Sequence, residues 1–177
     1  MSAPEAFRRQ LVGAIPRLRR YARSLVFDPG AADDLVQTAL ERALAHWHQF
    51  DQRRDILVWL LSIAHNAHLD IRRREQRVTL VEPEQIEAAQ DRLHADPGAD
   101  VGLRIDLQAA LAALAPEQCE PLLLVSVERL SYAECAEVLG IPIGTVMSRV
   151  SRARAALREY LDGRRREPRA RVLRRVI

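Results

Sequence analysis

The segment 131–150 constrains the fold more than any other part of the chain, because it specifies two short helices joined by a tight turn. Ser131 and Glu134 have the spacing of a capping box, in which each side chain satisfies a backbone amide at the start of a helix. Gly140 suits the left-handed conformation that follows a helix, and Pro142 blocks early continuation. A second helix is expected to open directly afterwards, at Gly144.

Each of these two helices has an apolar face and a polar face. The apolar face expected for the first consists of Ala133, Ala136 and Leu139, and that of the second of Val146, Val150, Ala153, Leu157 and Leu161. The remaining face of the second helix carries Met147, Ser148, Arg149, Ser151 and Arg152. Arginine and serine can bind phosphates and base edges, so the pattern predicts a DNA-binding helix-turn-helix. The alternative is the solvated face of an ordinary helical hairpin.

The rest of the chain also favours helices. Of its 177 residues 48% are apolar but only 5% aromatic, so the cores must consist of leucine, alanine, valine and isoleucine. Apolar positions recur at helical spacing through residues 1–75 and 103–162. Pro16 is expected to start or kink the first helix, and the segment 28–30 to break the chain before the second, with Asp33 and Asp34 in that helix's first turn. The sequence predicts an all-α chain with two small helical domains.

Two segments lack this helical pattern. Residues 77–102 are rich in aspartate and glutamate and have no sustained apolar period, which indicates an acidic linker. Residues 164–177 form a basic tail in which every charge but one is an arginine. The chain has no lysine. We therefore expect domains at 1–76 and 103–163, on either side of the linker.

The helix expected over residues 55–75 carries two stripes. The core stripe consists of Leu57, Leu60, Leu61, Ala64, Ala67 and Ile71. The second stripe consists of Trp59, Ile63, Asn66, Asp70 and Arg73. Tryptophan and asparagine side chains can stack on and hydrogen-bond to unpaired bases, so this face could hold single-stranded nucleic acid. It could equally be a second core contact, and the spacing alone leaves both interpretations open.

Other classes of function receive little support. The cysteines Cys119 and Cys135 are isolated, and no cysteine or carboxylate completes a zinc site with the pairs His46/His48 or His65/His68. The sequence contains no catalytic motif that we could identify. It has no signal-peptide pattern and no apolar run near the ~20 residues that span a bilayer. We expect a reduced, soluble, cytoplasmic protein that is not an enzyme and needs no cofactor.

Several motifs, taken in order, resemble those of the extracytoplasmic-function (ECF) sigma factors. The strings DDLVQ at 33–37 and WLLSIAHN at 59–66 resemble sigma region 2. The strings APEQ at 115–118, LSYAE at 130–134 and GTVMSR at 144–149 resemble sigma region 4. The acidic stretch corresponds to the linker between the two regions. The resemblance implies a non-enzymatic subunit that directs RNA polymerase to promoters.

The same resemblance implies roles for individual residues. The residues implied to bind the clamp helices of the largest polymerase subunit are Asp33, Asp34, Leu35, Gln37 and Thr38. Those implied to recognise the −10 element are Phe50, Asn66, Asp70, Arg72, Arg73 and Arg74, with Phe50 and Asn66 at a flipped base. Those implied to recognise the −35 element are Met147, Ser148, Arg149, Ser151 and Arg152. Further implied partners are the flap of the second-largest polymerase subunit and an anti-sigma factor, without membrane insertion.

The sequence departs from the family at a few positions. Met147 stands where lysine or arginine is frequent, Cys119 where arginine is common, and Cys135 where a branched aliphatic is usual. These departures could alter the preferred promoter sequence. Two other functions remain open: a stand-alone helix-turn-helix regulator, and a sigma mimic that binds an anti-sigma factor but not DNA.

Overall fold

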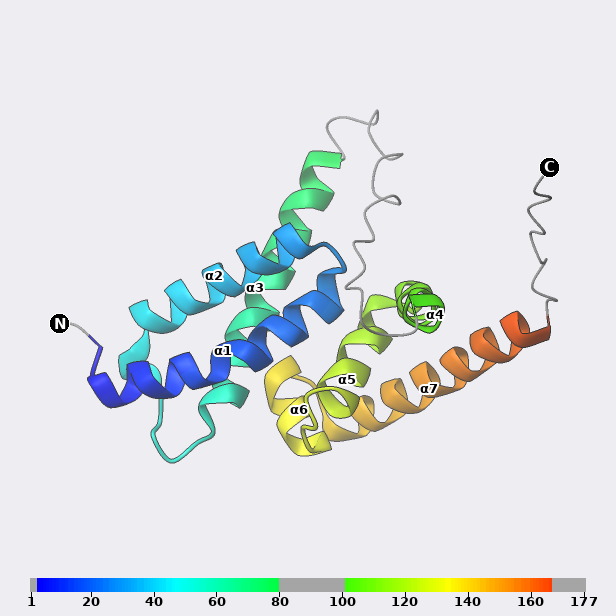
Figure 1. Cartoon of the computed structure of the whole chain (residues 1–177). Helices are drawn as coiled ribbons and strands as arrows, with labels where there is room; N and C mark the ends of the chain where they lie inside the picture. Colours follow the sequence, from blue (N-terminus) through cyan, green and yellow to red (C-terminus); the bar gives the residue numbers. More distant parts are fainter. Residues whose placement is uncertain (1–2, 80–100, 167–177) are drawn as a thin grey trace.

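The computed structural model describes residues 3–79 and 101–166, and their regular structure is entirely helical (Figure 1). The helices are α1 (Glu5–Val26), α2 (Pro29–Ala45), the 3₁₀ helix η1 (Trp47–Gln49), α3 (Ile56–Thr79), α4 (Val101–Ala112), α5 (Pro116–Ser126), α6 (Tyr132–Leu139) and α7 (Ile143–Arg166). Helices α1–α3 contact one another and form the N-terminal module, and α4–α7 form the C-terminal module. The predicted all-α fold is confirmed.

The N-terminal module is held together by fully buried side chains from all three of its helices. Tyr21, Leu18, Leu35, Leu60 and Leu61 are each at most 1% exposed. The core stripe predicted for α3 is confirmed, because its members are buried apart from Ile71, which is partly buried. Helix α3 ends at Thr79, one turn beyond the expected Glu75.

The first helix is longer than predicted. Helix α1 begins at Glu5 and continues through Pro16, so the proline neither starts the helix nor ends it. Pro16 is exposed, and a proline inside a helix removes a single backbone hydrogen bond. The buried stripe on the opposite side, which includes Leu11 and Leu18, spans the proline and offsets that loss.

The predicted break at residues 28–30 is confirmed. Phe27 ends α1 in a left-handed conformation with φ 59°. The Asp28 side chain then accepts a hydrogen bond from the backbone amide of Ala31 at 2.8 Å, and Pro29 is the first residue of α2. Because α2 starts there, Asp33 and Asp34 lie in its second turn and not in the expected first turn.

The predicted helix-turn-helix is present as α6 and the start of α7. The Glu134 amide donates to Ser131 Oγ at 3.2 Å, and the Ser131 amide donates to Glu134 Oε2 at 2.8 Å, which completes the capping box. Gly140 follows with φ 64°. The stripe predicted for α7 is confirmed by the burial of Val146, Val150 and Ala153.

The face predicted for α6 is only partly confirmed, because Ala136 and Leu139 pack partly buried against the core but are not its fully buried residues. Cys135 and Val138 are its buried residues, whereas Ala133 is exposed. Helix α6 contacts α3 of the N-terminal module as well as α5 and α7. Its buried side is therefore set by three neighbours, which a pattern of small apolar residues within one short helix does not specify.

The two modules are joined by hydrogen bonds between charged and polar side chains. Both oxygens of the Glu128 carboxylate accept from the Arg20 guanidinium at 2.9 Å, and Arg17 Nε donates to the same group at 3.2 Å. The Glu128 side chain is fully buried. A buried carboxylate is stable only with such partners, so the C-terminal module depends on α1 to neutralise it.

A second contact lies deeper between the modules. The Tyr21 hydroxyl donates to Oε1 of Glu120, and His65 Nδ1 lies 2.6 Å from the same oxygen. All three residues are buried. At the outer edge, Arg54 forms an ion pair with Glu137 of α6. The three contacts between the modules thus each join a glutamate of the C-terminal module to groups of the N-terminal module. The glutamates are Glu120, Glu128 and Glu137.

Candidate nucleic-acid and polymerase interfaces

An open pocket of about 230 Å³ lies on the N-terminal module where the end of α2 meets the middle of α3. It is lined by Arg42, His46, Gln49, Trp59, Ile63 and Asn66. Three of these belong to the second stripe of α3, so that stripe lines a surface pocket and is not wholly a core contact. An indole ring, an amide and a guanidinium around one hollow are the groups that hold an unpaired base by stacking and hydrogen bonding.

Local contacts hold two of the pocket's polar side chains in place. Asn66 is exposed, and its amide nitrogen donates to the Ser62 carbonyl one turn earlier at 2.9 Å. That leaves the amide oxygen of Asn66 as a hydrogen-bond acceptor. Arg42 Nη1 donates to Asp70 Oδ2 at 2.9 Å, and both side chains are part-exposed. Asp70 therefore lies next to the pocket and holds the Arg42 side chain in position there.

The Phe50 side chain lies in the core and not on the surface of the N-terminal module. It is 8% exposed and packs against Phe7 and Trp59, with ring centroids 5.8 Å and 5.2 Å away. Phe7 in turn packs against the edge of Trp59. In the free chain the Phe50 ring therefore supports Trp59 from the core side and is not presented to solvent.

The arginines that follow on α3 have different environments. Arg73 and Arg74 are exposed and Arg72 is half-buried. They extend from the Asn66 pocket toward the C-terminal end of α3, so this helix presents positive charge next to the pocket. Such charges suit phosphate contacts, which supply affinity without reading sequence.

The outward face of α7 contains the residues predicted to read DNA. Met147, Ser148, Ser151 and Arg152 are exposed, and Arg149 is half-buried. Arg152 Nε donates to the Ser148 carbonyl at 3.3 Å, and Ser148 Oγ donates to the Thr145 carbonyl at 3.0 Å. The N-terminal half of α7 thus offers one mixed polar and apolar surface on the side away from the core.

The face of α2 expected to contact polymerase is mostly accessible. Asp33, Asp34 and Gln37 are exposed and Thr38 is half-buried. Leu35 is 1% exposed, so its side chain anchors α2 in the bundle and does not belong to the accessible face of the helix. Arg19 of α1 lies 3.8 Å from Asp33, a pair of half-exposed groups that contributes little to stability.

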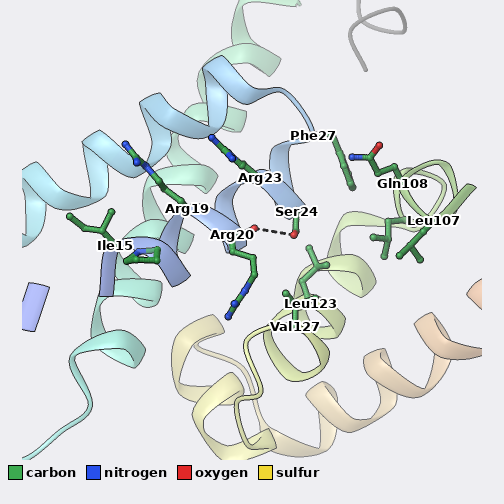
Figure 2. A pocket seen from close by; sticks show the side chains of 12 residues that line it. Ile15, Arg19, Arg20, Arg23, Ser24, Phe27, Leu107, Gln108, Leu123 and Val127 are labelled. Atoms are coloured by element: carbon green, nitrogen blue, oxygen red, sulfur yellow. Dashed lines mark hydrogen bonds between the residues drawn. The ribbon is translucent and has the colours of Figure 1, made fainter. Parts of the chain in front are cut away.

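A larger hollow of about 610 Å³ lies between the modules (Figure 2). Helix α1 supplies its basic rim, with Arg19, Arg20 and Arg23, and α4 and α5 supply apolar side chains that include Leu107 and Leu123. A groove that is apolar on one wall and positive on the other fits a helix with an apolar stripe flanked by carboxylates. The sequence patterns had not indicated this groove, because its two walls come from distant parts of the chain.

The thiols and imidazoles of the described residues form no metal or redox site. Burial raises the pKa of Cys119 to about 11 and that of Cys135 to about 12, so both thiols stay protonated at neutral pH and react slowly. Burial also lowers the pKa of His68. Within residues 3–79 and 101–166, no three histidine, cysteine or acidic side chains gather as metal ligands. In the same ranges, no helix has the length and hydropathy to cross a membrane.

Several residues at these sites follow no pattern in the sequence. Arg42, His46 and Gln49 complete the pocket, and Arg42 and His46 lie one helical turn apart. Glu120 and Glu128 bracket the dense apolar run of α5. An acidic side chain beside such a run is the one signal that could have indicated a buried partner.

A helix-turn-helix on one module and a pocket lined by an indole, an amide and a guanidinium on the other are features typical of the class of DNA-binding proteins. Comparison with known proteins identifies the family of this chain. The model for Sigma-70 region 4 matches residues 104–157, and that for the Sigma2 domain of PhyR matches residues 11–65. The ECF RNA polymerase sigma factor EcfG of Rhodopseudomonas palustris is 35% identical over 92% of this chain and 90% of its own. The chain belongs to the ECF family of RNA polymerase sigma factors.

Two further comparisons agree. The ECF sigma factor SigC of Mycobacterium tuberculosis is 38% identical over 73% of this chain and 70% of its own. Among solved structures, sigma factor RpoE in complex with the anti-sigma factor NepR from Bartonella quintana matches with a TM-score of 0.80. It is 31% identical, and the match covers 90% of this chain and 98% of RpoE. The anti-anti-sigma factor PhyR of the same organism is 17% identical and shows the shared fold alone.

Proposed function

We propose that this sigma factor directs RNA polymerase to promoters by reading the −10 element with the N-terminal module and the −35 element with the C-terminal module. The observation that carries the proposal is that each module has an exposed surface with side chains suited to binding DNA. These surfaces are the Asn66 pocket on the N-terminal module and the outward face of α7 on the C-terminal module. Phosphate contacts supply affinity, and contacts to base edges supply discrimination. Core polymerase sets the spacing of the two modules, so that each raises the effective concentration of the other at its element.

In this proposal the Asn66 pocket takes one base flipped from the non-template strand. Trp59 stacks on the base, Asn66 and Arg42 bind its polar edge, and Phe50 supports the indole from behind. Capture of the base offsets the cost of unstacking it and so favours melting at one sequence. The arginines Arg72, Arg73 and Arg74 hold the adjoining phosphates.

Polymerase contacts are assigned to the exposed face of α2 and to the C-terminal module. Asp33, Asp34, Gln37 and Thr38 bind the clamp helices of the largest subunit, with Leu35 holding the helix from below. The C-terminal module, within residues 103–163, binds the flap of the second-largest subunit. The protein acts in the cytoplasm, where polymerase is, and performs no chemistry of its own. Residues 77–102 link the modules, and residues 164–177 form a basic tail. Of these segments, residues 80–100 and 167–177 lie outside the described residues.

A matched set of variants tests the assignment of α7. Arg149→Ala combined with Arg152→Ala removes two positive charges from the DNA face without touching the buried stripe. We expect transcription from −35-dependent promoters to fall at least tenfold while binding to core polymerase is unchanged, since each lost contact is worth about 1–3 kcal/mol. The control is Arg158→Ala, an exposed arginine further along α7. Unchanged transcription by the double variant would contradict the assignment.

A gel shift with and without core polymerase separates this function from that of a stand-alone regulator. Tight and specific binding of promoter DNA by the free chain would favour the regulator. A chain that binds an anti-sigma factor but never joins core polymerase would be a sigma mimic instead. We expect specific binding in the presence of core polymerase alone.

The partner that restrains this sigma factor is an anti-sigma factor, and we place part of its contact in the groove of Figure 2. The basic rim and the apolar wall support this position. The variant Arg23→Glu reverses one positive charge of the rim. Arg23 is chosen because, unlike Arg20, it does not bind Glu128. The wild-type chain is first used to capture a protein from its own cells that lowers transcription by the holoenzyme. That protein should bind the Arg23→Glu variant less tightly than the wild-type chain. Equal binding would place the contact elsewhere.

A further inference from the structure

The DNA-facing side of α7 begins with an exposed apolar pair, Ile143 and Met147. These side chains are 49% and 53% exposed, which places them among the few large apolar side chains that the described residues leave open to solvent. They lie one helical turn apart and therefore point to the same side of α7. Neither is needed by the core, because Val146 and Val150 already fill the buried side at 0% and 1% exposure.

Both side chains of the pair are open to solvent. Gly144, on the adjoining flank of α7, also faces open space, because a methyl group added there would meet nothing within 4 Å. Arg152 folds back onto Ser148 and leaves the pair uncovered. The first turn of α7 can therefore approach a groove of DNA closely, with apolar atoms at its leading edge.

The major groove offers one apolar group, the C5 methyl of thymine, and otherwise presents hydrogen-bond donors and acceptors. Met147 has no strong donor or acceptor, and its flexible thioether adapts to small apolar partners. Isoleucine likewise can contribute only apolar contact. A lysine or arginine at position 147 could bind the O6 and N7 atoms of guanine, which methionine cannot do.

We propose that Ile143 and Met147 read thymine methyl groups in the −35 element, so that this sigma factor selects thymine where a basic residue at position 147 would select guanine. The inference rests on the proposed function of α7, because it assumes that this helix enters the major groove. It assigns the specificity of one or two base pairs to apolar contact.

Replacement of single thymines by deoxyuridine tests this directly, because deoxyuridine lacks only the methyl group. The template is a promoter mapped by its transcription start after overexpression of the chain, with each −35 thymine of either strand replaced in turn. Holoenzyme containing the wild-type chain should lose about fourfold in affinity at one or two positions, which is the factor expected for burial of one methyl group. Met147→Ala should show no loss at the position that Met147 reads.

A gain of specificity provides the second readout. Met147→Arg should bind more tightly to a template with guanine at the position that Met147 reads, whereas the wild-type chain should bind that template more weakly. The control is Val12→Ala, which shortens an exposed apolar side chain on the N-terminal module. It should keep the wild-type response to deoxyuridine at every position.

Two different failures can be told apart. If the −35 element can be scrambled without effect, α7 does not read it and the proposed function itself fails. If scrambling abolishes binding but every deoxyuridine template binds as well as its thymine parent, the methyl-reading role is overturned and the function of α7 stands.

Discussion

His65 of α3 and Glu120 of α5 meet where the two modules touch, with the Nδ1 atom of the histidine 2.6 Å from Oε1 of the glutamate. Their side chains are only 11% and 10% exposed. The Tyr21 hydroxyl donates to the same oxygen, and burial together with Glu120 raises the pKa of Tyr21 well above its usual value. A single carboxyl group of one module thus serves two buried polar groups of the other.

Removal of that carboxyl group should destabilise the folded chain. Glu120→Ala leaves Tyr21 and His65 buried without their partner, and each unsatisfied group costs about 1–3 kcal/mol. We expect the free energy of unfolding in urea to fall by about 2 kcal/mol or more. Glu117→Ala, an exposed neighbour on the same helix, is the control and should change it by less than about 0.5 kcal/mol. Equal stability of the two variants would show that the Glu120 contact contributes nothing.

The contact of Glu128 with Arg17 and Arg20 should control how often the modules separate. Cys119 and Cys135 react with thiol reagents slowly while they are buried, so their labelling rate reports opening of the structure. Glu128→Gln removes the charge from the ion pairs, and charge-assisted hydrogen bonds are worth about 1.5–3 kcal/mol. We expect labelling to accelerate at least tenfold, measured with a chromogenic disulfide. Glu159→Gln, at an exposed site on α7, should label at the wild-type rate.

The capping box of α6 makes the stability depend on pH. Hydrogen bonds from Ser131 lower the pKa of Glu134. A lowered pKa in the folded state adds stability above the unfolded-state pKa, near 4.5, and this stability is lost as the pH falls through the folded-state value. Ser131→Ala should reduce the free energy of unfolding by about 1 kcal/mol at pH 7 and by less in acid. Ser126→Ala, exposed at the end of α5, is the control; a deficit that does not shrink in acid would contradict the role of Glu134.

The pocket on α3 should act in promoter opening and not in initial binding. Asn66→Ala removes an exposed amide from the pocket and leaves Trp59 and its aromatic neighbours intact. Permanganate footprinting of unpaired thymines should show opening reduced by about tenfold, while closed complexes form at the wild-type level. An equal loss at both stages would contradict the flipped-base assignment.

Local sequence signals predicted much of the fold and part of the candidate site. The capping box at Ser131, the turn at Gly140 and the stripe through Val146 and Val150 depend on neighbours within a few positions, and all three are present. The second stripe of α3 left two interpretations open. The structure has features of both, because Trp59 and Ile63 pack partly against the core while Asn66 lies at a surface pocket.

The signals that failed involve contacts between distant segments. The buried side of α6 depends on α3, which no local pattern encodes. The contact of Arg17 and Arg20 with Glu128 spans more than 100 positions, so it could not be derived from spacing. The burial of Phe50 against Phe7 and Trp59 likewise depends on the packing of three separate segments, which no local pattern encodes.

Run-off transcription from a mapped promoter, with purified core polymerase in the presence and absence of this chain, tests the account most directly. We expect a specific transcript only when the chain is added. We also expect the transcript to be lost when either the −10 or the −35 element is scrambled. A specific transcript from core polymerase alone, or no transcript despite a stable complex of the chain with core polymerase, would contradict the account.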